Sequence, residues 1–151
     1  MTAVLYHAIA LSDDSMKKYP FAGIFIYAGL ILTCGVIPPT FFREAQNIMS
    51  PIASLVSDHT LHGLGFGVFA WLLCFGYYSA GYRKLPLIRI ITISLAYGLF
   101  IEAVQIPLPY RVFEWTDIYA DGAGVLAAVI LFILVIRIRY IRNRPRPKEI
   151  A

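Results

Sequence analysis

Long apolar runs separated by short polar segments dominate the hydropathy pattern of the chain. The runs extend over residues 19–37, 60–78, 86–106 and 116–136. Each is close to the ~20 residues that a helix needs to cross the hydrocarbon core of a bilayer. Lipid offers the backbone no hydrogen-bond partners, so such runs are expected to be helical. The pattern therefore predicts an all-α membrane protein, a four-transmembrane-helix bundle.

The segment between the first two runs has a different pattern. In residues 40–57, apolar side chains recur at near-helical spacing among polar ones. This spacing is typical of a helix that lies on a membrane surface. We expect an amphipathic outer-surface helix between spans 1 and 2. The whole chain, 1–151, is interpreted as one membrane domain, with most of the unusual polar residues in 58–124 and a basic tail at 137–151.

Composition supports lipid as the solvent. The chain is 59% hydrophobic and 15% charged, whereas soluble domains are about half apolar and a quarter charged. Cys34 and Cys74 both lie inside apolar runs. The predicted topology places them at different depths, too far apart for a disulfide. We therefore interpret both as small core residues.

Basic residues predict how the bundle is oriented. Of the 13 Lys and Arg residues, all except Arg43 and Arg111 fall on the same side as the two termini in the four-span arrangement. Cytoplasmic segments are enriched in Lys and Arg, so both termini are expected in the cytoplasm. The basic tail either contacts anionic lipid or serves only as a topology signal. No folded basic surface indicates nucleic-acid binding.

Polar residues within the spans converge on one layer. Antiparallel spans place His62, Glu102 and Asp121 about one turn below the outer boundary, because they come from three successive spans of alternating direction. Arg111 lies in the short connection above them. His59 is left as a surface residue. The predicted pocket comprises Asp58, His62, Glu102, Gln105, Arg111, Asp117 and Asp121.

Two interpretations of this layer stay open. An ionisable group near the bilayer centre costs about 2.5–3.5 kcal/mol or more, and apolar residues flank Glu102. The layer is either a structural lock between helices or a polar pocket open to the outside. Asp117 is also placed to cap the fourth helix. Gly63 and Gly67 are expected to mark close helix packing.

Catalysis and metal binding are also open from the residue types. His with carboxylates can perform general acid–base chemistry. His62, Glu102 and Asp121 could also hold a divalent cation through nitrogen and oxygen ligands. No zinc-type Cys or His pair and no serine nucleophile motif occurs in the sequence. We expect no cofactor other than this possible cation. Whether the protein is an enzyme stays undecided.

These residues resemble those of the VanZ-like family of small integral membrane proteins. Asp58-His59-Thr60-Leu61-His62 resembles the Asp-Lys-x-x-His motif of the family, and Glu102-Ala103-Val104-Gln105 resembles its Glu-x-x-Gln motif. The resemblance continues through Arg111, Asp117, Asp121 and Gly124. Three positions depart from the family pattern. His59 replaces a Lys, Glu114 a small hydroxyl residue and Asp121 an Asn, and each makes the site more negative or less positive.

The resemblance implies a place and a role. The family is named for a protein linked to teicoplanin resistance, so we expect a multi-pass protein of the bacterial cytoplasmic (inner) membrane that acts on the cell envelope. The pocket is expected to bind a glycopeptide antibiotic, a lipid-linked precursor or a lipid head group, in envelope homeostasis or antibiotic resistance. The alternatives are a membrane-embedded hydrolase or transferase and a structural or assembly subunit. A transporter is less expected, because four spans are few and no broken helix is evident.

Overall fold

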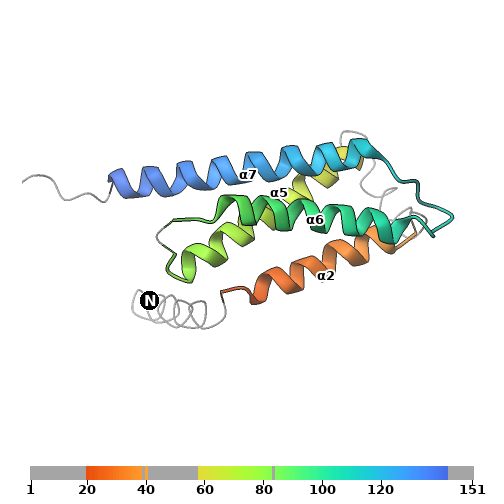
Figure 1. Ribbon diagram of the computed structural model, residues 1–151, viewed down its shortest axis with the longest axis horizontal. Helices are drawn as coiled ribbons and strands as arrows, with labels where there is room; N and C mark the ends of the chain where they lie inside the picture. Colours follow the sequence, from red (N-terminus) through yellow and green to blue (C-terminus); the bar gives the residue numbers. More distant parts are fainter. Residues whose placement is uncertain (1–19, 39, 41–57, 83, 143–151) are drawn as a thin grey trace, which may run out of the picture.

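All the regular secondary structure in the described part of the protein is helical. The computed structural model describes residues 20–38, 40, 58–82 and 84–142. It contains α2 (Ala22–Val36), α5 (Asp58–Ser79), α6 (Leu87–Gln105) and α7 (Trp115–Arg142), and no strand occurs in these ranges. The helices form an elongated bundle in which α2 and α6 run toward the end where α5 and α7 begin (Figure 1). We call this end the polar end and the opposite one the basic end.

Three of the helices have the length and composition of membrane spans. Residues His59–Ser79, Leu87–Gln105 and Trp115–Arg142 are long and apolar enough to cross a bilayer. The fourth helix, α2, has 15 residues and is about 22 Å long at 1.5 Å per residue. This confirms the all-helical prediction and fits a membrane protein, whereas the four-span count stays a prediction. The surface helix expected at 40–57 lies outside the described residues except for Thr40.

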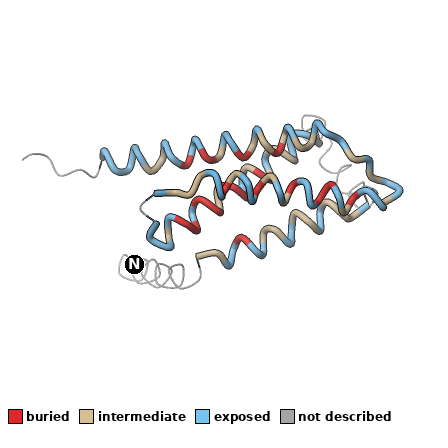
Figure 2. Tube along the Cα trace, viewed as in Figure 1, coloured by how far each residue is buried: buried red, intermediate tan, exposed pale blue. Residues whose placement is uncertain are grey.

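The core is narrow, and much apolar surface faces outward. Phe66 and Phe69 of α5 lie against Tyr97 of α6, with the Phe69 and Tyr97 rings stacked at 5.2 Å. Buried positions follow the inward face of each helix, and exposed positions the outward face (Figure 2). Yet Phe25 is 76% exposed and Ile88 is 84% exposed. Side chains this large and apolar fit an environment of acyl chains better than water.

Small residues let α5 and α7 approach closely. A Cβ atom built on Gly63 would lie 3.2 Å from the Ala120 carbonyl oxygen, and one on Gly67 would lie 3.2 Å from the Gly124 carbonyl oxygen. A Cβ on Gly124 would overlap the Gly63 carbonyl. The expected role of Gly63 and Gly67 in close helix packing is therefore confirmed.

The prediction for the two cysteines is half wrong. Both are free, and Cys74 is buried in the core as expected, but Cys34 is exposed. The reason lies in how α2 packs, because Ile24 is its one buried residue. A helix that contacts the bundle along a narrow stripe leaves most of its apolar residues facing outward, and Cys34 is among them.

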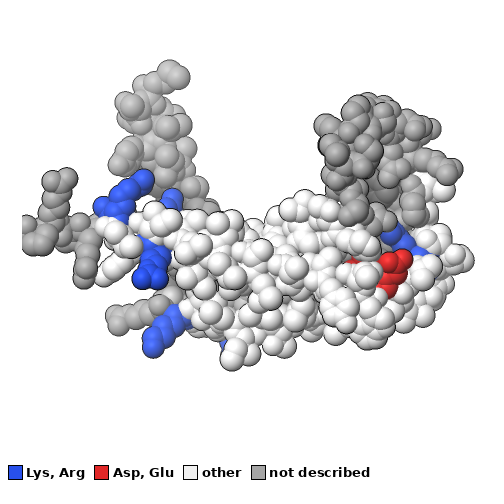
Figure 3. Space-filling view, turned by 90° about the horizontal axis from the view of Figure 1, so that it is seen from above, with Lys and Arg blue, Asp and Glu red and all other residues white. Residues whose placement is uncertain are grey.

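Charge separates along the bundle. In the space-filling view, several Lys and Arg side chains gather at one end and the visible acidic side chains lie near the other (Figure 3). The basic end carries Lys84 and Arg89 around the start of α6. At the same end, Arg139 and Arg142 lie in the last turn of α7. This arrangement agrees with the charge asymmetry predicted from sequence.

Candidate functional site

Three helices bring acidic and imidazole groups to the polar end. His59 and His62 lie in the first turns of α5, Glu102 lies in the last turn of α6, and Asp117 lies in the first turn of α7. Asp121 follows one turn later. A carboxylate in the first turn of a helix is favoured by the helix dipole, which suits Asp117. We call His59, His62, Glu102, Asp117 and Asp121 the acid–imidazole cluster.

The His62 imidazole faces a carboxylate with each ring nitrogen. Its Nδ1 lies 3.1 Å from Asp121 Oδ1, in hydrogen-bond range, and its Nε2 lies 3.7 Å from Asp117 Oδ2. Asp117 and Asp121 are four residues apart, so they share one face of α7. Asp121 is 1% exposed, and the His62 side chain is 21% exposed. The imidazole therefore lies between a buried carboxylate and one nearer the surface.

Glu102 is the least satisfied member of the cluster. It is 1% exposed, and neither carboxylate oxygen makes a hydrogen bond of ordinary geometry within the described part of the chain, although the Glu114 backbone amide lies nearby. One ligand atom from each of His62, Glu102 and Asp117 lies within 4.8 Å of the others. Removing a carboxylate from water without pairing it is costly. The cluster thus holds a buried carboxylate that lies near two possible partners, His62 and Asp117, without a hydrogen bond to either.

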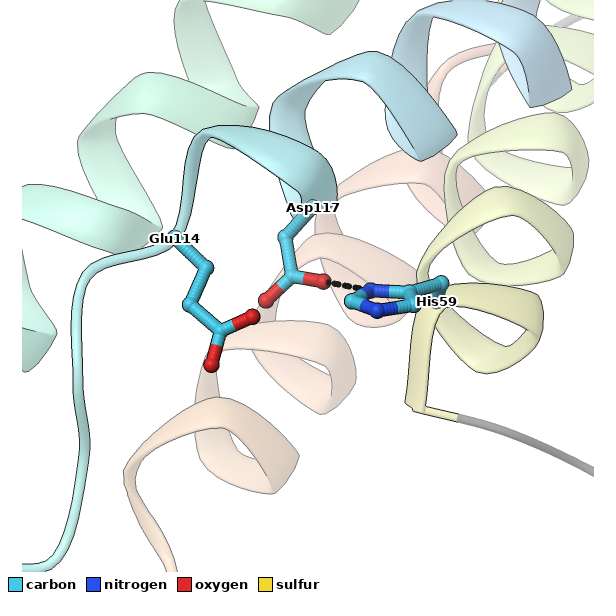
Figure 4. Close-up of side chains that lie close together, drawn as sticks. All are labelled: His59, Glu114 and Asp117. Carbon is cyan, nitrogen blue, oxygen red and sulfur yellow. Dashed lines mark hydrogen bonds and ion pairs between the residues drawn. The ribbon is translucent and has the colours of Figure 1, made fainter.

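A second triad lies nearer the surface. Asp117 lies between His59 and Glu114 (Figure 4). His59 Nδ1 is 2.6 Å from Asp117 Oδ1, and Thr116 Oγ1 donates to Glu114 Oε2 at 3.2 Å. The His59 side chain is 49% exposed, as expected for a surface residue, but its bond to Asp117 makes it part of the site. Its spacing of three residues from His62 on one helix was the signal that could have found it.

Gln105 and Arg111 face α2. Gln105 Nε2 donates to the Gly35 carbonyl at 3.0 Å, and an Arg111 terminal nitrogen donates to the carbonyls of Cys34 at 3.3 Å and Ile37 at 3.4 Å. Tyr110 donates to the Val36 carbonyl at 2.8 Å. The last carbonyls of a helix have no intrahelical partner. Four consecutive carbonyls at the end of α2 thus receive side-chain donors, which we call the carbonyl cap.

The predicted site therefore divides into two parts. The acid–imidazole cluster contains His62, Glu102, Asp117 and Asp121, and the carbonyl cap contains Gln105 and Arg111. Among the residues that the structure describes, no carboxylate lies within ion-pair distance of Arg111, and its buried Nε has no partner. Asp58 begins α5, but its side chain lies outside the described part.

Gly98 of α6 is a site residue that pattern reasoning missed. A Cβ atom there would lie 2.7 Å from Asp121 Oδ2. This glycine therefore leaves the space that the Asp121 carboxylate occupies beside His62. One glycine within an apolar helix carries no signal of such a contact, because the carboxylate comes from a different helix.

Two shallow grooves lie elsewhere on the described surface. One is lined by residues around the start of α6, including Leu85 and Ile93, and the other by the end of α2 together with Tyr110. Neither lining includes a member of the acid–imidazole cluster. A pocket around the cluster stays a prediction.

Comparisons with known proteins supply the family. No curated protein matches the chain, and no solved structure matches it. The sequence profile described as VanZ/LLP1 matches residues 20–137. The matched range extends from just before α2 into the last turns of α7, so it contains both the cluster and the cap. Because the match covers more than half of the chain, the protein belongs to the VanZ/LLP1 family.

Proposed function

We propose that this VanZ/LLP1 protein binds the polar head of a cell-envelope molecule in its acid–imidazole cluster, at the outer face of the bacterial cytoplasmic membrane. The observation that carries the proposal is the buried carboxylate of Glu102 beside His62 and Asp117, which has no hydrogen-bond partner among the described residues. A buried carboxylate without a hydrogen-bond partner is suited to a donor from outside. Candidate molecules are a glycopeptide antibiotic, a lipid-linked precursor or a lipid head group.

The charge of the cluster favours donors in the ligand. Its carboxylates outnumber its two imidazoles, and the nearby Arg111 guanidinium is directed at α2 carbonyls. Such a site attracts hydroxyl and ammonium groups and disfavours a bare phosphate. Sugar hydroxyls and amino groups of a glycopeptide or of a glycosylated precursor fit this requirement. A role in envelope homeostasis or in resistance to glycopeptides such as teicoplanin would follow.

Two observations support the proposed topology. The basic end carries the described Lys and Arg residues other than Arg111, which favours a cytoplasmic location for that end. The α2 segment also reaches both ends of the bundle. Phe21 contacts Tyr77 near the end of α5, with ring centroids 5.3 Å apart, while the carbonyl cap holds the last turn of α2 at the polar end. Four crossings, with both termini in the cytoplasm, fit these contacts.

The test is a binding titration with full-length protein in lipid nanodiscs. Teicoplanin and a lipid-linked cell-wall precursor are titrated separately against the wild type and Glu102→Gln. Replacing the carboxylate should weaken binding by about ten- to a hundredfold, the range for losing a charge-assisted hydrogen bond. Arg89→Gln at the basic end is the control and should leave the affinity unchanged. Equal affinities for the wild type and Glu102→Gln would contradict the proposal.

A structural lock is the second candidate function, and the carbonyl cap favours it. Gln105 and Arg111 satisfy α2 backbone groups that would otherwise lack partners in the bilayer. The His62–Asp121 hydrogen bond likewise joins α5 to α7. These contacts hold helices in register without any ligand. They account for the cap and for Asp121, but they leave Glu102 unexplained.

A further inference from the structure

The geometry points to a site for one first-row divalent cation, Zn²⁺ or Mn²⁺, ligated by His62 Nε2 and by one carboxylate oxygen each of Glu102 and Asp117. These three residues come from α5, α6 and α7, and their candidate ligand atoms all lie within 4.8 Å of one another. The inference goes beyond the proposed function and does not depend on which envelope molecule binds. It concerns only groups that the protein itself supplies.

The spacing leaves room for an ion. His62 Nε2 and Asp117 Oδ2 are 3.7 Å apart, which is too long for a hydrogen bond. Zinc bonds to nitrogen and oxygen at about 2.0–2.2 Å, so two ligands of a tetrahedral ion are about 3.4 Å apart. A small side-chain movement would therefore close the site around a cation.

The burial of the Glu102 carboxylate is a second observation that supports a cation site, beside the spacing of the three ligand atoms. This carboxylate is 1% exposed, lies in the same triad and has no hydrogen-bond partner among the described residues. In the interior, a charge without a partner is far more costly than a paired one. A divalent cation would neutralise both carboxylates of the triad and give Glu102 the partner that it lacks among the described residues.

Asp121 is placed to orient the His62 ring for binding a cation. A metal-binding histidine usually directs its second ring nitrogen at a carboxylate or carbonyl, which sets the tautomer and orients the ring. His62 Nδ1 lies 3.1 Å from Asp121 Oδ1, and this leaves Nε2 directed at the triad. Gly98 preserves this arrangement, because a side chain there would displace the Asp121 carboxylate. Asp121 is therefore a positioning residue in this site and not a ligand.

The outer triad of His59, Glu114 and Asp117 is less suited to an ion. Its atoms also lie within 4.8 Å of one another, but His59 Nδ1 and Asp117 Oδ1 are already bonded at 2.6 Å (Figure 4). An ion between them would have to break that contact. His59 and Glu114 are both exposed, so water can satisfy them without a metal. In the inner triad of His62, Glu102 and Asp117, the Glu102 carboxylate is neither exposed to water nor hydrogen-bonded to a described residue.

The ligand types select the kind of cation. An imidazole nitrogen favours zinc and other first-row metals, whereas all-oxygen sites suit Mg²⁺ and Ca²⁺. Two carboxylates beside the imidazole make Mn²⁺ acceptable as well. Three protein ligands leave at least one coordination position for water or for another oxygen donor, as in catalytic zinc sites. The His62 side chain is partly exposed, which provides an entry path.

The test uses the full chain without a polyhistidine tag, purified in detergent and stripped with chelator. ZnCl₂, MnCl₂ and MgCl₂ are titrated in separate calorimetric experiments, with no envelope ligand present. We expect about one zinc or manganese ion per chain, with much weaker binding of magnesium. Glu102→Gln should weaken zinc binding by at least about tenfold, and Asp121→Asn by about 10–100-fold. Glu114→Gln, a matched carboxylate substitution in the outer triad, should leave affinity unchanged.

The outcomes separate this inference from its alternatives. Gel filtration and circular dichroism show whether each variant keeps the wild-type fold. If Glu102→Gln does not fold, His62→Asn takes its place and should weaken zinc binding by the same factor.

Two results would overturn the inference. The first is that the wild type binds neither zinc nor manganese. The second is that Glu114→Gln loses zinc binding while Glu102→Gln keeps it, which would place the ion in the outer triad. The nanodisc titration measures binding of an envelope molecule in a separate experiment, so failure of the cation site and failure of the proposed function can be told apart.

Discussion

Two polar residues near the end of α6 are buried in different ways. Glu102 and Gln105 are both buried, and they lie three residues apart. Gln105 donates to the Gly35 carbonyl, so its burial contributes a bond between α6 and α2. Glu102 has no such partner in the described chain. At the scale of single residues, one side chain therefore joins two helices, while its neighbour is a buried carboxylate without such a bond.

This difference predicts opposite effects of one substitution at the two positions. In metal-free protein, Glu102→Met should raise the unfolding temperature, because it removes a buried carboxylate that lacks a hydrogen-bond partner; even buried ion pairs replaced by apolar side chains gain up to about 1–4 kcal/mol. Gln105→Met should lower it, because the Gly35 carbonyl loses its donor at a cost of about 1–3 kcal/mol. Thermal unfolding in detergent with chelator measures both. A lower unfolding temperature for Glu102→Met would identify Glu102 as part of a structural lock.

At the scale of elements, backbone proximity decides how α5 and α7 fit. The two helices meet through Gly63, Gly67, Ala120 and Gly124, where the absence of large side chains lets the backbones approach. This contact sets the distance between the first turns of α5 and α7. The His59–Asp117 and His62–Asp121 pairs depend on that distance. The glycines therefore position the cluster without belonging to it.

An added methyl group should test this dependence. Gly124→Ala places a Cβ against the Gly63 carbonyl, so we expect destabilisation of about 1–3 kcal/mol from overpacking, together with weaker zinc binding. Gly65→Ala is the matched control, because a Cβ there meets nothing within 4 Å. It should be neutral or stabilise by up to about 1 kcal/mol, since alanine favours helix. Equal stability of the two variants would show that the glycine contact does not govern the fit.

At the scale of the whole molecule, the two ends of the bundle differ in charge. The basic end carries Lys and Arg from the α5–α6 connection and from the end of α7, and the polar end carries the acidic groups (Figure 3). Retaining Lys and Arg on the cytoplasmic side is the strongest determinant of orientation. The cluster would then face the cell envelope, where its proposed ligands are found.

Labelling of single cysteines should report this orientation. In a chain carrying Cys34→Ser and Cys74→Ala, Val112→Cys in the connection between α6 and α7 should react with a membrane-impermeant maleimide added to intact sphaeroplasts. Arg142→Cys at the end of α7 should react only after permeabilisation. Both positions are exposed, so a difference reports the side of the membrane. The reverse pattern would invert the proposed topology and place the cluster in the cytoplasm.

The helices were predictable, and their ends less so. The runs at 60–78 and 86–106 correspond closely to α5 (Asp58–Ser79) and α6 (Leu87–Gln105). The run ending at residue 136 is shorter than α7, which continues to Arg142. The apolar pattern stops where Arg and Lys begin, yet a helix can continue into water with charged side chains. The first run, in contrast, is longer than the 15-residue α2.

The sequence predicted the height of the site residues along the helices, but not which side chains contact one another. Residue spacing and antiparallel order placed His62, Glu102 and Asp121 in one layer, and the structure brings His62 and Asp121 to 3.1 Å. The same reasoning put Arg111 above the carboxylates, whereas its donors bond to α2. It also left out His59 and Gly98. The height of a residue follows from counting residues along its helix, whereas its hydrogen-bond partner depends on how neighbouring helices are rotated about their axes.

By itself, the sequence determined that the chain forms apolar helices and which acidic and imidazole residues share a height. Both follow from local rules, because lipid requires intrahelical hydrogen bonds and each residue adds a constant rise. The tertiary structure decided which groups bond, which remain unpaired and where a side chain would not fit. Those outcomes depend on distances of a few ångströms between residues as far apart as Cys34 and Arg111, and these distances are set by packing between helices.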